Sequence, residues 1–288
     1  IPRCESFASF ITSTTSICVT GLVVVNTFEY WSFFGQVVIL ILIQLGGLGV
    51  VAVSTFIMMV IGKKVLLKER MLIQDAYGLE TLSGMVKFVK HVFILTMIIE
   101  MIGAIIYMFK FIPEFGVGKG IWISVFNAVS AFCNAGIDVI GPSSLMNYTD
   151  SPLVNFTTMF LIISGGIGFI VWFDVFVVIK KIKNKEINYN CMFSRLTLHS
   201  KLVIVTTLVL IFLGAIFILA FEYNNPLTMN DLPWGEKIMA SFFLLFTTRT
   251  SFKSMFYSIM FFSLFTIVKS FHCSYQITCN SSDSFKHK

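Results

Sequence analysis

The chain has 288 residues, of which 56% are hydrophobic and only 12% are charged. Soluble domains carry about a quarter charged residues, and 15 acidic residues against 32 phenylalanines leave too little polar surface for an exterior in contact with water. This composition excludes an ordinary soluble enzyme and indicates a membrane protein. The net charge of +6 is therefore not taken to indicate a nucleic-acid partner, and what matters is where the 21 lysines and arginines lie.

Four apolar stretches are long enough to cross a bilayer core about 30 Å thick, which takes roughly 20 helical residues. They cover residues 34–61, 88–109, 153–179 and 202–221, and a shorter fifth stretch covers 255–268. These runs predict an all-α, multi-pass membrane protein.

Basic residues gather in two of the connections, 62–87 and 180–201, while Asp138, Asp150 and Asp231 lie in the alternate connections. Cytoplasmic loops carry an excess of lysine and arginine, so we expect the two basic loops to face the cytoplasm and the acidic connections to face outward. Basic residues near the ends of spans also attract anionic membrane lipid.

Residues 120–136 read GIWISVFNAVSAFCNAG, an amphipathic helix that is too short to cross and ends in small and polar residues. Irregular backbone at membrane depth survives only where protein buries it or water reaches it. The segment therefore predicts a re-entrant pore loop, and the alternative is a helix lying at the membrane surface.

An internal repeat favours the pore loop. The turn CVTG that ends at Gly21 recurs 115 positions later as CNAG, ending at Gly136, and GGLGV from Gly46 recurs 119 positions later as GGIGF from Gly165. A third turn is expected near position 251, where 247–250 reads TTRT without a following glycine. Each unit then holds a span, a short dipping helix, a small polar turn and a glycine-bearing span.

A turn at the end of a half-crossing helix directs backbone carbonyl groups toward an axis, where they can replace the hydration shell of a monovalent cation. Glycine permits the backbone angles that such a turn needs. The ligands are then main-chain oxygens, so the pattern predicts ion conduction, with no catalytic residues and no metal site beyond the ions in the turns.

With these motifs the chain resembles the potassium uptake proteins of the Ktr, Trk and HKT superfamily, most closely the pore-forming KtrB-type subunits. The resemblance rests on CVTGLVV, GGLGV, FCNAGID, GGIGF and TTRT. It implies four span, pore-loop, span units around one pore, of which this chain holds two to three. The implied selectivity-filter residues are Val19, Thr20, Gly21, Asn134, Ala135, Gly136, Thr248, Arg249 and Thr250.

The resemblance also implies the physiology. K⁺ is the expected transported ion, glycine rather than serine at Gly21 is the family state associated with potassium preference, and Na⁺ is the expected coupling ion. The expected partners are membrane lipid, a second copy in a homodimer, and a cytoplasmic nucleotide-binding regulatory subunit, since the chain has no nucleotide-binding motif and needs no cofactor of its own. The expected location is the bacterial plasma membrane.

We expect the chain to be divided into segments that follow the internal repeats. It consists of a partial repeat 1 over 1–61, a cytoplasmic loop over 62–87, repeat 2 over 88–179, a cytoplasmic loop over 180–201, a partial repeat 3 over 202–252 and an aberrant tail over 253–288. The family pattern stops after Thr250, and a truncated or frameshifted reading frame is the simplest account of the change in sequence at that point.

Four features have two interpretations each. For Glu100, inside an apolar span, helix packing is favoured over direct ion handling. Asp174 is expected to reach the cytoplasmic interface or to pair with nearby lysines. The glycine motifs at 46–49 and 165–168 are expected to allow close helix packing, with hinges as the alternative. Arg249 either sets the field at the pore mouth or pairs with an outward-facing acidic residue.

Two other functions stay open. One is a secondary transporter of another class, in which broken helices hold a substrate at the membrane midplane. The other is a non-functional truncated remnant.

A lone copy of this chain, with two complete filter turns, is expected not to form a selective pore. The check is growth of a potassium-uptake-deficient bacterium that expresses exactly this polypeptide. Growth in micromolar potassium would contradict the expectation.

Overall fold

The computed structural model describes residues 2–61, 71, 85–141, 144–148, 151–184, 192–223, 234, 235, 237, 241, 242 and 245. Every regular element within these ranges is a helix, as the sequence predicted. In chain order they are α1 Pro2–Cys18, α2 Thr27–Tyr30, α3 Phe33–Leu48, α4 Val50–Val60, α6 Met85–Phe115, α7 Val117–Phe132, the 3₁₀ helix η1 Ser144–Tyr148, α8 Pro152–Gly166, α9 Phe169–Lys183, α10 Met192–Arg195 and α11 Leu198–Glu222.

Two helices are long and apolar enough to cross a membrane, one within α6 and the other α11. Two further candidates are pairs of helices, α3 with α4 and α8 with α9, which bend by 105° and 95° at a short break. The predicted spans 88–109 and 202–221 are thus single helices, whereas 34–61 and 153–179 each correspond to a bent helix pair that remains a candidate span.

Glycine causes both breaks. Gly49 and Gly168 have φ angles of 84° and 94°, a region that residues with a side chain rarely adopt. A Cβ atom on either glycine would meet nothing within 4 Å. These two glycines therefore bend the chain, and the packing role expected for the whole motif does not apply to them.

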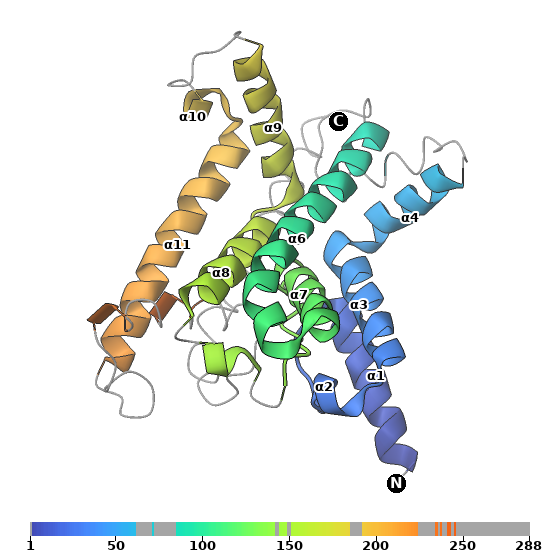
Figure 1. Ribbon diagram of the computed structural model, residues 1–288. Coiled ribbons are helices and arrows are strands. Elements are labelled where there is room, and N and C mark those ends of the chain that lie inside the picture. The colour runs from blue at the N-terminus through green and yellow to red at the C-terminus, as the bar shows by residue number, and fades with distance from the viewer. Residues whose placement is uncertain are drawn as a thin grey trace, which may run out of the picture. The chain divides into compact units, whose positions relative to one another are not determined.

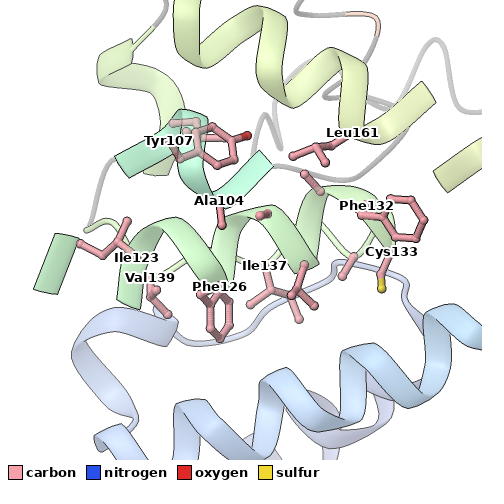
Figure 2. Packing of buried hydrophobic residues seen from close by; sticks show 14 of the residues in the cluster. Ala104, Tyr107, Ile123, Phe126, Phe132, Cys133, Ile137, Val139 and Leu161 are labelled. Carbon is pink, nitrogen blue, oxygen red and sulfur yellow. The ribbon is translucent and has the colours of Figure 1, made fainter. Parts of the chain in front are cut away.

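Helix α7 is the centre of the described fold. It packs against α6, α8 and α3 (Figure 1), and ten of its 16 residues are buried. Figure 2 shows Ile137 and Val139 beside Phe126, so the segment after α7 runs back along the helix. Burial to this extent is what the re-entrant interpretation requires, because a helix lying at the membrane surface would leave one face uncovered by the rest of the fold.

A buried hydrogen bond joins α6 to α8. The Tyr107 hydroxyl of α6 lies 2.7 Å from Thr158 Oγ1 of α8, and both side chains are buried. A polar pair inside an apolar core fixes the register of the two helices, because a mismatched pairing leaves polar atoms unsatisfied.

Asp174 binds Thr197 of the expected cytoplasmic loop 180–201, and its position at the cytoplasmic interface stays a prediction. Its Oδ2 accepts hydrogen bonds from the Thr197 backbone N–H and from Thr197 Oγ1, both at 2.8 Å. Thr197 is itself the N-cap of α11 and accepts from the Ser200 N–H. Asp174 therefore ties α9 to the start of α11, and it makes no lysine pair among the described residues.

Several expectations fall outside the described residues. These are the third filter segment Thr248, Arg249 and Thr250, most of the loop 62–87, the fifth apolar stretch 255–268 and the tail 253–288.

The bend at Gly168 can be tested by Gly168→Ala. The added Cβ strains the backbone, and the expected loss is roughly 1–3 kcal/mol of stability, measured as thermal unfolding of the detergent-solubilised protein. The matched control is Gly118→Ala in the first turn of α7, where a Cβ meets nothing and the φ angle is ordinary. Equal unfolding temperatures for the two variants would contradict the strain.

Candidate functional site

The two predicted turns share one backbone conformation. We call residues 19–21 the first turn and residues 134–136 the second turn. Val19 and Gly21 have φ angles of 55° and 74°, and Asn134 and Gly136 have 59° and 69°. Positive φ is uncommon for a residue such as valine, so its recurrence at the same spacing as the sequence repeat shows that the two segments adopt the same turn.

The same hydrogen bonds hold both turns. Near the end of α1, the carbonyl and hydroxyl oxygens of Thr15 accept from the N–H groups of Thr20 and Leu22, at 3.1 and 3.0 Å. Near the end of α7, the Ser130 carbonyl oxygen accepts from the Ala135 N–H at 2.8 Å, and the Ser130 hydroxyl oxygen accepts from the Ile137 N–H at 3.0 Å. A single residue in each helix thus clamps the turn that comes after it.

Thr15 and Ser130 are functional residues that sequence reasoning missed. The available signal was their separation of 115 positions, which equals the offset of the turns. Because the clamp uses N–H groups of the turns, it leaves their carbonyl oxygens free to face a ligand.

The electrostatic setting favours a cation. The first turn follows the carboxyl end of α1 and the second follows that of α7. A helix carries a partial negative charge at this end. Neither helix has a basic residue in its last turn to neutralise that charge.

The turns are seated on glycines of the following helix. A Cβ on Gly46 would lie 2.1 Å from the Ile17 carbonyl oxygen, and a Cβ on Gly165 would lie 1.8 Å from the Phe132 carbonyl oxygen. Only glycine allows this approach, so the expected close packing is confirmed at these two positions. Each repeat therefore places the last turn of its dipping helix directly on its second span.

Helix α3 contacts both turns, because Gly46 lies against Ile17 and Val19 and Gly47 lies against Cys133. A Cβ on Gly47 of α3 would lie 2.4 Å from Cys133 Sγ, directly before the second turn. Figure 2 shows this sulfur on the side of α7 that faces the N-terminal part of the chain. Nearby, Trp122 Nε1 donates to Gln36 Oε1 at 2.8 Å.

The predicted site residues differ in exposure. Gly21, Ala135 and Gly136 are buried, Val19 and Asn134 are partly buried, and Thr20 is exposed. Outside the second turn, Asp138 accepts from the Ser144 hydroxyl and from the Ile140 N–H. The Asp138 carboxylate therefore holds the loop that follows the turn.

The described residues contain no group of three or more His, Cys, Asp or Glu side chains that could hold a metal ion. The oxygens at the two turns are those of the backbone, the Thr20 hydroxyl, and Asn134 Oδ1, which has no hydrogen-bond partner among the described residues. Such oxygens suit a weakly held monovalent cation.

The clamp can be tested by Ser130→Ala. The Ile137 N–H then loses its acceptor in a buried position, which is expected to cost about 1–3 kcal/mol in thermal unfolding. Ser124→Ala is the control on the same helix, because the buried Ser124 hydroxyl only donates to the Gly120 carbonyl within α7. Equal losses in both variants would argue against a special role for Ser130.

Comparison with known proteins agrees with this geometry. The sequence profile of TrkH, described as a cation transport protein, matches residues 4–269. The Ktr system potassium uptake protein B of Bacillus subtilis is 40% identical over 243 residues, which are 84% of this chain and 52% of that protein. The potassium/sodium uptake protein NtpJ of Enterococcus hirae is 37% identical over 84% of this chain and 51% of its own length.

A third relative, the Ktr system potassium uptake protein B of Vibrio alginolyticus, is 31% identical over 84% of this chain and 51% of its own length. The chain thus spans about half the length of these relatives. Its apolar helices and bacterial relatives identify a multi-pass protein of the bacterial plasma membrane. Because the profile covers most of the sequence, the chain belongs to the TrkH family of cation transport proteins.

Proposed function

We propose that this chain lines part of a pore for potassium uptake, and that the carbonyl oxygens of the first and second turns replace the hydration shell of K⁺. The observation that carries the proposal is the duplicated turn. Both copies have left-handed backbone at two positions and a hydroxyl clamp on their N–H groups. Both also follow the carboxyl end of a helix that no basic residue neutralises.

Potassium is the favoured ion for chemical reasons. Uncharged carbonyl oxygens bind a large monovalent cation weakly enough to release it, as conduction requires. Two relatives are named as a potassium uptake protein and a potassium/sodium uptake protein. The resemblance adds Na⁺ as the coupling ion. The filter assignment of residues 19–21, 134–136 and 248–250 is part of this proposal, as is the division into repeats and loops.

Partners are also proposed. The exposed apolar surface of α11 suits membrane lipid, because Leu198, Phe212 and Phe221 are each more than half exposed. A homodimer and a cytoplasmic nucleotide-binding regulatory subunit are carried over from the resemblance. The relatives named as parts of a Ktr system support a multi-subunit assembly.

A secondary transporter is the second candidate, and the bends at Gly49 and Gly168 favour it, because such proteins bind substrates at broken helices. The residues that flank these bends are apolar, including Leu48, Ile167 and Phe169. The breaks therefore offer no polar side chain of their own to a substrate, whereas the turns offer a repeated set of oxygens.

A chimaera tests the function. The matched region of this chain replaces the corresponding region of the Bacillus subtilis relative and is expressed in a potassium-uptake-deficient bacterium. The chimaera is expected to restore growth at micromolar potassium, because its turns complete the set supplied by the relative. Failure of a correctly inserted chimaera would contradict the proposal and favour the non-functional remnant.

Gly136→Ser in the chimaera tests the filter itself. A side chain at φ 69° strains the second turn by about 1–3 kcal/mol, so the potassium concentration for half-maximal uptake is expected to rise about tenfold or more. Gly118→Ala is the control and leaves uptake unchanged. Unchanged potassium dependence in Gly136→Ser would contradict the filter assignment. That result would favour a secondary transporter that binds its substrate at the bends of Gly49 and Gly168.

A further inference from the structure

Glu100 is a carboxyl group in the middle of α6 and is only 4% exposed. Its Oε2 accepts a hydrogen bond from Gln44 Nε2 of α3 at 3.2 Å, while its Oε1 has no partner among the described residues. One turn earlier, the buried Thr96 hydroxyl is likewise without a partner in the described part of the chain. Within that part, the Gln44 amide is the one side-chain anchor of the Glu100 carboxyl.

Gln44 also reaches the second turn. The Cys133 thiol donates to Gln44 Oε1 at 3.8 Å, and Cys133 directly precedes Asn134. The same sulfur packs on Gly47, one helical turn after Gln44. The side chains of Glu100, Gln44 and Cys133 thus form a chain of hydrogen bonds that joins α6 and α3 to the start of the turn.

The chemistry of the amide gives this chain of hydrogen bonds a direction. An amide has a donor end and an acceptor end. The carboxyl oxygen of Glu100 takes the donor end of Gln44, so the acceptor end must face the thiol. Without that carboxyl oxygen, the amide is free to turn and to present its NH₂ group, which cannot accept the S–H.

We propose that Glu100 is a positioning residue for the second turn, which it holds in place through Gln44 and Cys133. This inference rests on the proposed function, in which the second turn is a filter strand. A positioning role differs from the two interpretations given for Glu100 from the sequence. The carboxyl orients the turn as well as packing two helices, and it does not itself contact the ion.

The test measures alkylation of Cys133 by a maleimide in the full, detergent-solubilised chain, with Cys4, Cys191, Cys273 and Cys279 replaced by serine. Cys18 is exposed and Cys133 is buried, so Cys18 serves as the internal reference. Glu100→Leu, which removes both oxygens, and Gln44→Leu are each expected to raise the rate at Cys133 relative to Cys18 about tenfold, the effect of losing a hydrogen bond of typical strength.

Two further variants separate positioning from general loosening. The exchange Glu100→Gln with Gln44→Glu keeps a carboxyl and an amide in contact and still leaves an oxygen for the thiol, so it is expected to restore the slow rate. Tyr107 lies on the same helix as Glu100, and Tyr107→Phe breaks its buried hydrogen bond to Thr158 of α8. This variant is expected to leave the Cys133 rate unchanged.

An unchanged rate in Glu100→Leu would overturn the inference, and so would an equal rise in Tyr107→Phe. A second arm uses the chimaera described above, with Glu100, Gln44, Cys18 and Cys133 retained, and compares alkylation in K⁺ with that in Na⁺ at equal ionic strength. Slower alkylation of Cys133 in K⁺ supports the filter. No difference between the ions, together with a rise in Glu100→Leu, would contradict the filter while upholding the link from Glu100 to the turn.

Discussion

The contact on which the described structure depends is that of a backbone carbonyl against a glycine. The Ile17 carbonyl sits on Gly46 and the Phe132 carbonyl sits on Gly165, at distances that leave no space for a Cβ atom. In a membrane, helices gain little from the hydrophobic effect, and close backbone approach supplies the packing that holds them together. Here that approach also fixes where α1 and α7 end against the following helices, and with it the position of each turn.

The glycines of the motif at 46–49 have three different tasks. Gly46 receives the carbonyl of its own repeat, Gly47 receives the thiol of Cys133 from the next repeat, and Gly49 bends the chain. In the second repeat, Gly165 likewise receives a carbonyl of its own repeat, and Gly168 bends the chain. One short motif therefore seats a turn, joins two repeats and redirects a helix.

Polar side chains connect this apolar scaffold to the turns. Ser130 clamps the second turn from inside α7, and Gln44 approaches it from α3 while bound to Glu100. A buried polar group is costly unless it is paired, so these pairs restrict the arrangements open to the helices. The relatives named as cation uptake proteins and the membership of the TrkH family agree with a scaffold of this kind around an ion path.

Composition and spacing alone determined the membrane setting, the helical class, the repeat and the two turns, because low charge, apolar runs and recurring glycines are properties of the linear sequence. Only the tertiary structure decided that Gly46 packs while Gly49 bends, that Asp174 binds Thr197, and that Glu100 reaches Cys133 through Gln44. These outcomes depend on which residues meet across helices. Gln44 and Glu100 are 56 positions apart, and no local pattern records that they touch.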